Sequence, residues 1–177
     1  MTIELHVPGL KEMAARQAWL SDPRTMDYNR GRELGGAEGY DPATGCIDFS
    51  RENWRYWRQV WLFNEPDFYS AYIRDAERDC FVGEVCWFRE GEDFTAGILI
   101  AAQYRRQGYC APALRLLAER AFQREDIPCP SVRRPGGEFS RYQRLCPGGF
   151  CESRGAGRHG PAGAAPRGLG TIMNQGA

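Results

Sequence analysis

The stretch FTAGILIAAQYRRQGYCAPALRLLAERAF, residues 94–122, decides how this chain is interpreted. Residues 94–101 are apolar enough for a buried strand, and from Ala111 to about Glu125 apolar residues recur at helical spacing. The short turn between them, Gln103 to Cys110, is basic and contains Gly108. A strand that runs through such a turn into a helix gathers unpaired backbone N–H groups at the positive end of the helix dipole, and this arrangement binds phosphate. The pattern predicts an anion-binding turn, although many strand–helix turns carry Gly and Arg without a ligand.

The residues before this stretch predict further strands and helices. Polar turns separate three successive strand patterns, so we expect an antiparallel meander. A Trp stripe at helical spacing in residues 51–63 is typical of core packing, with a substrate-binding aromatic wall as the alternative. The expected order is a strand at 3–7, a helix at 10–20, a long loop at 26–49, a helix at 51–63 begun by Ser50, and strands at 68–74, 80–88 and 94–101.

Residues 105–114, RRQGYCAPAL, resemble the acetyl-CoA signature of the GCN5-related N-acetyltransferase (GNAT) family, Gln/Arg-x-x-Gly-x-Gly/Ala at the start of the central helix. Arg105 matches the first position and Gly108 the fourth, while Cys110 stands at the sixth, where Gly or Ala is usual. The order of elements over about residues 2–126 is also similar. The resemblance implies an α/β (α+β) fold with a mixed, mostly antiparallel central sheet and flanking helices.

The same resemblance implies an N-acetyltransferase that moves acetyl from acetyl-CoA to a primary amine of a small molecule or a protein. Its implied acetyl-CoA-binding residues are Ile98, Leu99, Ile100, Arg105, Arg106, Gln107, Gly108, Tyr109, Cys110 and Ala111. Glu84 is the leading candidate for the base, because its strand lies beside the strand that would bind acetyl-CoA, although a solvated or paired strand carboxylate is the favoured interpretation. Tyr28, Tyr40 and Asp48 are candidates for the acceptor pocket.

Composition narrows the setting. The 23 basic and 23 acidic residues cancel, which gives no support for a nucleic-acid partner. No window is apolar enough to span a membrane and the start does not look like a signal peptide, so we expect a cytoplasmic protein. The seven Cys include no C-x-x-C pair. They are therefore interpreted as free, mostly buried thiols, and no metal site is expected. The oligomeric state stays open, a homodimer included.

The last 50 residues differ from the rest. Up to Ile127 there are 16 Lys/Arg and 21 Asp/Glu, and from Pro128 onward 7 and 2, while 17 of those 50 residues are Gly or Pro. We therefore expect an acetyltransferase-like domain over 1–127, truncated on its C-terminal side, and a tail over 128–177 with no recognisable strand. The tail has two interpretations: a disordered basic segment, or a GC-rich coding sequence read out of frame. Codons can be chosen for 131–150 whose next frame encodes ACDDLAANSAAISAFARAG, which resembles the missing part of the family pattern.

Without its C-terminal strands the sheet would end in an open edge at residues 94–101, and we expect low stability and reduced or absent activity. Two other functions stay open beside acetyl transfer. One is a non-catalytic CoA-binding module with a disordered interaction tail, and the other is a nucleotide-phosphate binder unrelated to CoA.

Overall fold

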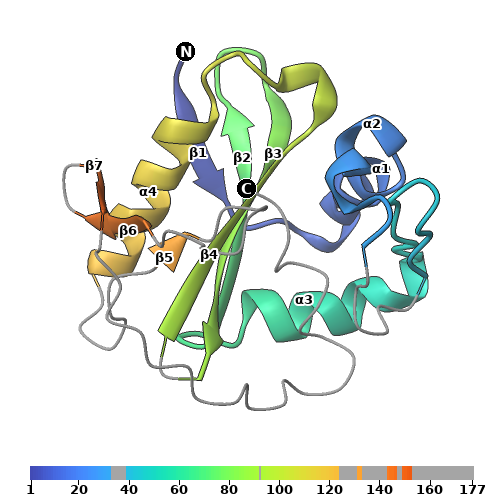
Figure 1. Cartoon of the computed structure of the whole chain (residues 1–177), viewed down its shortest axis with the longest axis horizontal. Helices are drawn as coiled ribbons and strands as arrows, with labels where there is room; N and C mark the ends of the chain where they lie inside the picture. Colours follow the sequence, from blue (N-terminus) through green and yellow to red (C-terminus); the bar gives the residue numbers. More distant parts are fainter. Residues whose placement is uncertain (33–38, 92, 124–130, 133–142, 147–148, 153–177) are drawn as a thin grey trace.

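The computed structural model describes residues 1–32, 39–91, 93–123, 131–132, 143–146 and 149–152. These residues form one seven-stranded sheet whose strands lie side by side in chain order (Figure 1). The strands are β1 (Ile3–His6), β2 (Phe68–Asp75), β3 (Cys80–Glu90), β4 (Asp93–Ile100), β5 (Ser131–Val132), β6 (Gln143–Cys146) and β7 (Gly149–Glu152). The α-helices are α1 (Met13–Leu20), α2 (Pro23–Met26), α3 (Trp54–Leu62) and α4 (Cys110–Phe122).

The first four strands are antiparallel neighbours, which confirms the predicted meander. The β2–β3 and β3–β4 connections turn through residues with positive φ, Asp79 at 49° and Gly91 at 69°. β3 and β4 lie so close at Gly83 that a Cβ there would be 2.0 Å from the carbonyl oxygen of Leu99. Only glycine fits this contact, so a larger residue at position 83 would push the two strands apart.

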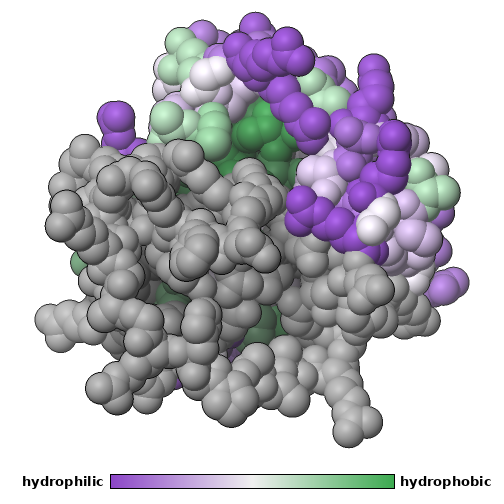
Figure 2. Space-filling model, viewed as in Figure 1, coloured by the Kyte–Doolittle hydropathy of each residue, from purple (hydrophilic) through white to green (hydrophobic). Residues whose placement is uncertain are grey.

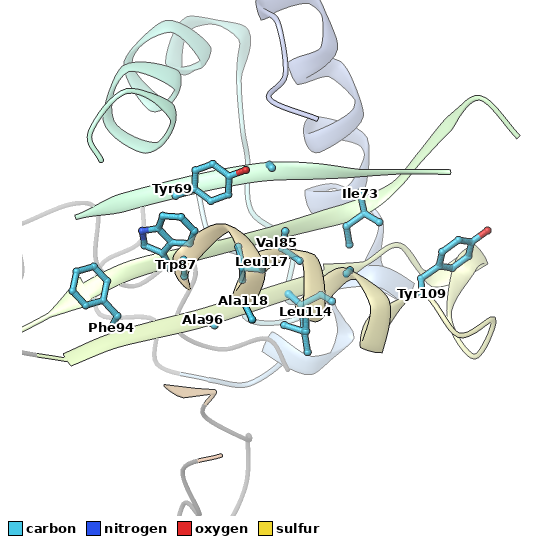
Figure 3. Packing of buried hydrophobic residues seen from close by; sticks show 14 of the residues in the cluster. Tyr69, Ile73, Val85, Trp87, Phe94, Ala96, Tyr109, Leu114, Leu117 and Ala118 are labelled. Atoms are coloured by element: carbon cyan, nitrogen blue, oxygen red, sulfur yellow. The ribbon is translucent and has the colours of Figure 1, made fainter. Parts of the chain in front are cut away.

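Apolar side chains cover both faces of the sheet. α4 packs on one face against residues such as Tyr69, Trp87 and Phe94, through Leu114 and Leu117 (Figure 3). α1 and α3 pack on the opposite face. There the Trp stripe is buried, as core packing predicts, in a cluster that includes Trp54, Trp57, Trp61, Tyr72, Cys86, Phe88 and Leu99.

Several sequence expectations need correction. No element is expected between the helix at 10–20 and the long loop at 26–49, but Pro23 begins the short helix α2 there, and Asp22 caps it by accepting from the N–H of Arg24 at 3.2 Å. Ser50 stands at the start of a 3₁₀ turn, but its side chain makes no capping hydrogen bond. On α4 the expected apolar face is buried except for Phe122, which is 37% exposed.

The expected open edge of the sheet is also wrong in part. β4 pairs in parallel with β5 at Thr95 and Ala96, and the antiparallel hairpin of β6 and β7 extends the sheet further. These strands lack an alternating apolar pattern. Main-chain groups of a strand edge can pair with any extended segment, whatever its side chains, so this pairing left no sequence signal. The remaining residues of the expected tail lie outside the described residues.

Four cysteines whose side chains the structure describes, Cys46, Cys80, Cys86 and Cys110, are free thiols. Among these four only Cys86 is buried, so the expectation that most thiols are buried is not met for them. In the described part of the chain no helix has both the length and the apolar composition needed to cross a membrane.

Candidate functional site

The turn between β4 and α4 presents a row of unpaired backbone donors. Arg106 and Gly108 adopt positive φ angles of 60° and 87°. The N–H groups from Arg106 to Ala111 have no hydrogen-bond acceptor among the described residues, and Pro112 has no N–H at all. The α4 dipole adds partial positive charge at the same point. The sequence predicts anion binding at this turn, and unpaired backbone donors are the groups that such binding uses.

The space above Gly108 is open. Among the described residues, the atom nearest to a Cβ built on Gly108 is the terminal methyl of Met1, at 3.9 Å. A group as bulky as a pyrophosphate can therefore approach this backbone, and a side chain at position 108 would fill the space. The open space at Gly108 is therefore suited to the diphosphate of a CoA molecule.

The outer edge of β4 supplies a second set of backbone groups. The Ala101 N–H donates to the Val82 carbonyl of β3 at 3.0 Å. Because alternate residues of an antiparallel strand face the same neighbour, Leu99 also directs its main-chain groups toward β3, and Ile98 and Ile100 direct theirs away from it. β5 pairs with β4 only at Thr95 and Ala96, so within the described residues no strand covers Ile98 and Ile100.

Figure 2 shows an apolar recess between hydrophilic residues in its upper part. Figure 1 is drawn from the same side and places the end of β4 there. Ile98 is 9% exposed and Ile100 is half-buried. An extended chain with amide groups would find apolar contacts along this edge, and main-chain groups that no described strand pairs with.

Arg105 differs from its expected role as a charge for phosphate. Its Nε donates to the Ile100 carbonyl at 3.1 Å, one terminal nitrogen to the Arg24 carbonyl at 3.1 Å, and the other to the Thr25 carbonyl. Since all three nitrogens are engaged, the side chain anchors the turn. Arg106 is exposed and keeps the expected charge at the turn.

Two further signature residues have clear surroundings. Tyr109 is buried and donates to the Asp75 carboxylate at 2.6 Å, which raises the pKa of Tyr109 to about 12 and lowers the pKa of Asp75. Tyr109 is therefore a packing residue that joins the turn to β2. Cys110 is exposed at the first position of α4, and partial desolvation raises the pKa of its thiol.

The Gln107 side chain connects the turn to the β2–β3 connection. Its carbonyl oxygen accepts from Arg78 at 2.9 Å, and its amide donates to the Gln103 carbonyl at 2.8 Å. Arg78 is thereby held beside the turn and adds a positive charge that sequence spacing did not predict.

Glu84 lies on β3 directly opposite Leu99, as its strand position implies, but its side chain is fully buried. Its Oε2 accepts from the Nε of Arg16 at 3.0 Å, and its Oε1 has no hydrogen-bond partner among the described residues. The Arg16 guanidinium in turn lies 4.2 Å from the ring centre of Trp57 and 4.6 Å from that of Phe49. Burial raises the pKa of Glu84, and Arg16 opposes this effect.

The three acceptor-pocket candidates are placed differently. Tyr28 is half-buried, and burial raises its pKa to about 12, with the charge of Glu84 acting in the same direction. The Tyr40 hydroxyl donates to the carbonyl of Asn29, the residue that follows Tyr28. This bond attaches Tyr40 to the segment that contains Tyr28. Asp48 is exposed and its N–H donates to the Gly39 carbonyl at 2.9 Å. The main chain of Asp48 therefore lies next to the bridge that pairs Tyr40 with Ile47.

Sequence reasoning missed Arg16 and Thr25, which hold the two ends of the site. Nothing in the spacing of the helix at 10–20 signals the partner of Arg16, which lies 68 residues away. Asp22 and Pro23 do form a recognisable helix start, which could have located α2 but not its contacts. Within the described residues no cluster of His, Cys, Asp and Glu is placed to hold a metal ion.

The comparisons with known proteins bear on the fold. No protein-family model matches the chain, and no curated protein matches its sequence. A crystal structure of a GNAT-family acetyltransferase from Bacillus anthracis superposes with a TM-score of 0.54 and 13% sequence identity, over 76% of this chain and 70% of that one. The chain therefore has a GNAT-like fold, as the signature residues implied.

Proposed function

We propose that this GNAT-like chain is an N-acetyltransferase that transfers acetyl from acetyl-CoA to a primary amine of a small molecule or a protein. The observation that carries the proposal is the run of N–H groups from Arg106 to Ala111, which have no acceptor in the described part of the chain and adjoin a stretch of β4 that no described strand covers. One site then offers an anion-binding turn for a diphosphate and a strand edge for an amide-containing arm.

The residues of this chain would divide the work as follows. The turn amides would hold the diphosphate, and the outward N–H and C=O groups of Ile98 and Ile100 would pair with the pantetheine amides. Acetyl-CoA, when bound, supplies an acyl thioester that a neutral amine can attack. Tyr28 and Tyr40 would line the acceptor side, and holding the two reactants together supplies much of the rate.

Glu84 is the base in this proposal, and its surroundings define how it would act. A raised pKa brings a carboxylate closer to the range in which a base works near neutral pH. Its free Oε1 can accept a proton, whereas its Oε2 is held by Arg16. Because the side chain is 0% exposed, the proton must reach Glu84 through a neighbouring group or a water molecule.

The test combines thermal shift with thiol release. CoA and acetyl-CoA should each raise the melting temperature, and acetyl-CoA should release free CoA thiol when a panel of primary amines is added. Stabilisation by ATP in preference to CoA would contradict the proposal and favour the nucleotide-phosphate binder.

A second function has one observation in its favour. The complete burial of Glu84 and its pairing with Arg16 suit a chain that binds CoA without catalysis. A CoA-induced thermal shift with no thiol release from any amine would support this alternative.

A further inference from the structure

A set of hydrogen bonds joins α2 to the β4–α4 connection. The Ala102 N–H donates to the Thr25 hydroxyl at 2.9 Å, and the Arg105 guanidinium donates to the carbonyls of Arg24 and Thr25. We call these four residues the Arg105 joint. The two sides of the joint are about 80 residues apart in the chain, so only the tertiary fold brings them together.

The joint satisfies groups that would otherwise lack partners. α2 has only four residues, so its last carbonyls have no partner within the helix. The planar guanidinium reaches two of these carbonyls at once, which a lysine ammonium on its flexible stem cannot reproduce. Thr25 is 1% exposed, so the joint has a buried side at Thr25, whereas Arg105 lies at the surface.

Each side of the joint leads to one half of the proposed active site. On one side the chain continues from Arg105 into the amides that would hold the diphosphate. On the other side, the segment of residues 23–31 contains Tyr28, and its Gly31 N–H donates to the Pro42 carbonyl at 2.9 Å. The acceptor side is therefore attached to the turn through Arg105 and Thr25.

We propose that Arg105 is a positioning residue that couples CoA binding to the order of the acceptor-side segment, residues 23–31. This inference rests on the proposed function, since CoA must occupy the turn. A ligand held by the turn amides favours the closed joint over the open one, and the closed joint holds α2 in place. The coupling is reciprocal, so an amine bound at residues 23–31 would also tighten CoA binding.

Amide hydrogen exchange on the full chain, with and without saturating CoA, tests the coupling. The reporters are the N–H groups of Met26 and Gly31, which donate to Asp22 at 3.0 Å and to Pro42 at 2.9 Å and are not part of the turn. In the natural chain CoA should slow their exchange at least about fivefold, the lower end of typical coupling between sites.

Two variants should remove this slowing while CoA still binds. Arg105→Lys keeps the charge and loses the fork. Thr25→Val keeps the shape and loses the acceptor for the Ala102 N–H, together with the bond that the Thr25 hydroxyl donates to Asp22 at 2.8 Å, so its exchange is compared with and without CoA in the same variant. Thr25→Ser restores the hydroxyl and should restore the slowing, which a merely space-filling role would not require. Arg115→Lys, an exposed exchange of the same kind on α4, is the matched control and should behave as the natural chain.

The outcomes separate the two claims. Slowing in the natural chain that is lost in Arg105→Lys and Thr25→Val supports the coupling. CoA binding without slowing at Met26 and Gly31, or equal slowing in Arg105→Lys, overturns the coupling and leaves the proposed function intact. Failure of the natural chain to bind CoA overturns both. If Arg105→Lys does not fold, the pair of Thr25 variants decides.

Discussion

Replacing Arg16 by Met tests the buried ion pair beneath the site. The guanidinium is 1% exposed and its partner Glu84 is 0% exposed, so the substitution leaves a carboxylate in the core without its counter-charge. Breaking a buried pair in this way costs about 3–5 kcal/mol of unfolding free energy. With a slope of about 2 kcal/mol per M urea, the unfolding midpoint should fall by about 1.5–2.5 M.

The loss should depend on pH. The folded-state pKa of Glu84 is raised by burial and lowered by Arg16, so removing Arg16 raises it further. A raised carboxyl pKa contributes stability that is complete below the unfolded-state value and is lost as the pH rises through the folded-state value. The Arg16→Met chain should therefore be destabilised more at pH 8 than at pH 5.

Urea unfolding followed by Trp fluorescence measures both effects, because Trp57 contacts the guanidinium. The double variant Arg16→Met, Glu84→Leu removes both charges and should lose less stability than Arg16→Met alone. Two results would refute the conclusion that the two buried charges compensate each other. One is an equal loss of stability in Arg16→Met at pH 5 and pH 8, and the other is a double variant less stable than Arg16→Met alone.

Three further outcomes are expected. Gly108→Val should abolish the thermal shift with CoA, because valine is strained at a φ of 87° and its side chain fills the open space. Gly91→Val introduces comparable strain at a φ of 69°, away from the turn, and should keep the thermal shift. Equal loss of the shift in both variants would point to strain alone. Tyr109→Phe should lower the melting temperature by several degrees near neutral pH, because it raises the lowered pKa of Asp75 toward its unfolded-state value and so removes stability that is present only above that value; the difference from the natural chain should shrink as the pH falls through the titration of Asp75, and an equal difference at pH 7 and pH 3 would contradict this. Glu84→Gln should remove the acidic limb of the kcat/KM profile if Glu84 accepts the proton, and an unaltered profile would exclude it as the base.

Local patterns predicted much of the backbone. The polar turns between residues 68 and 101 and the helical spacing after Ala111 are short-range signals, and the structure confirms the strands and the helix that they indicate. The signature turn could be found for the same reason, since Gly108 and its neighbours set the local backbone directly. Strands β5 to β7 could not be found, because they pair through main-chain groups with an edge that another part of the chain provides.

The sequence by itself determined the strand, glycine turn and helix that form the anion-binding turn, because these depend on neighbours a few residues apart. Only the tertiary structure decided what the charged side chains do. Arg105, which reads as a phosphate ligand, holds the carbonyls of α2, and Glu84, which reads as a strand carboxylate, is buried against Arg16. A long side chain can reach many partners, and its spacing in the sequence does not select one. Burial and the packing of distant segments make that selection.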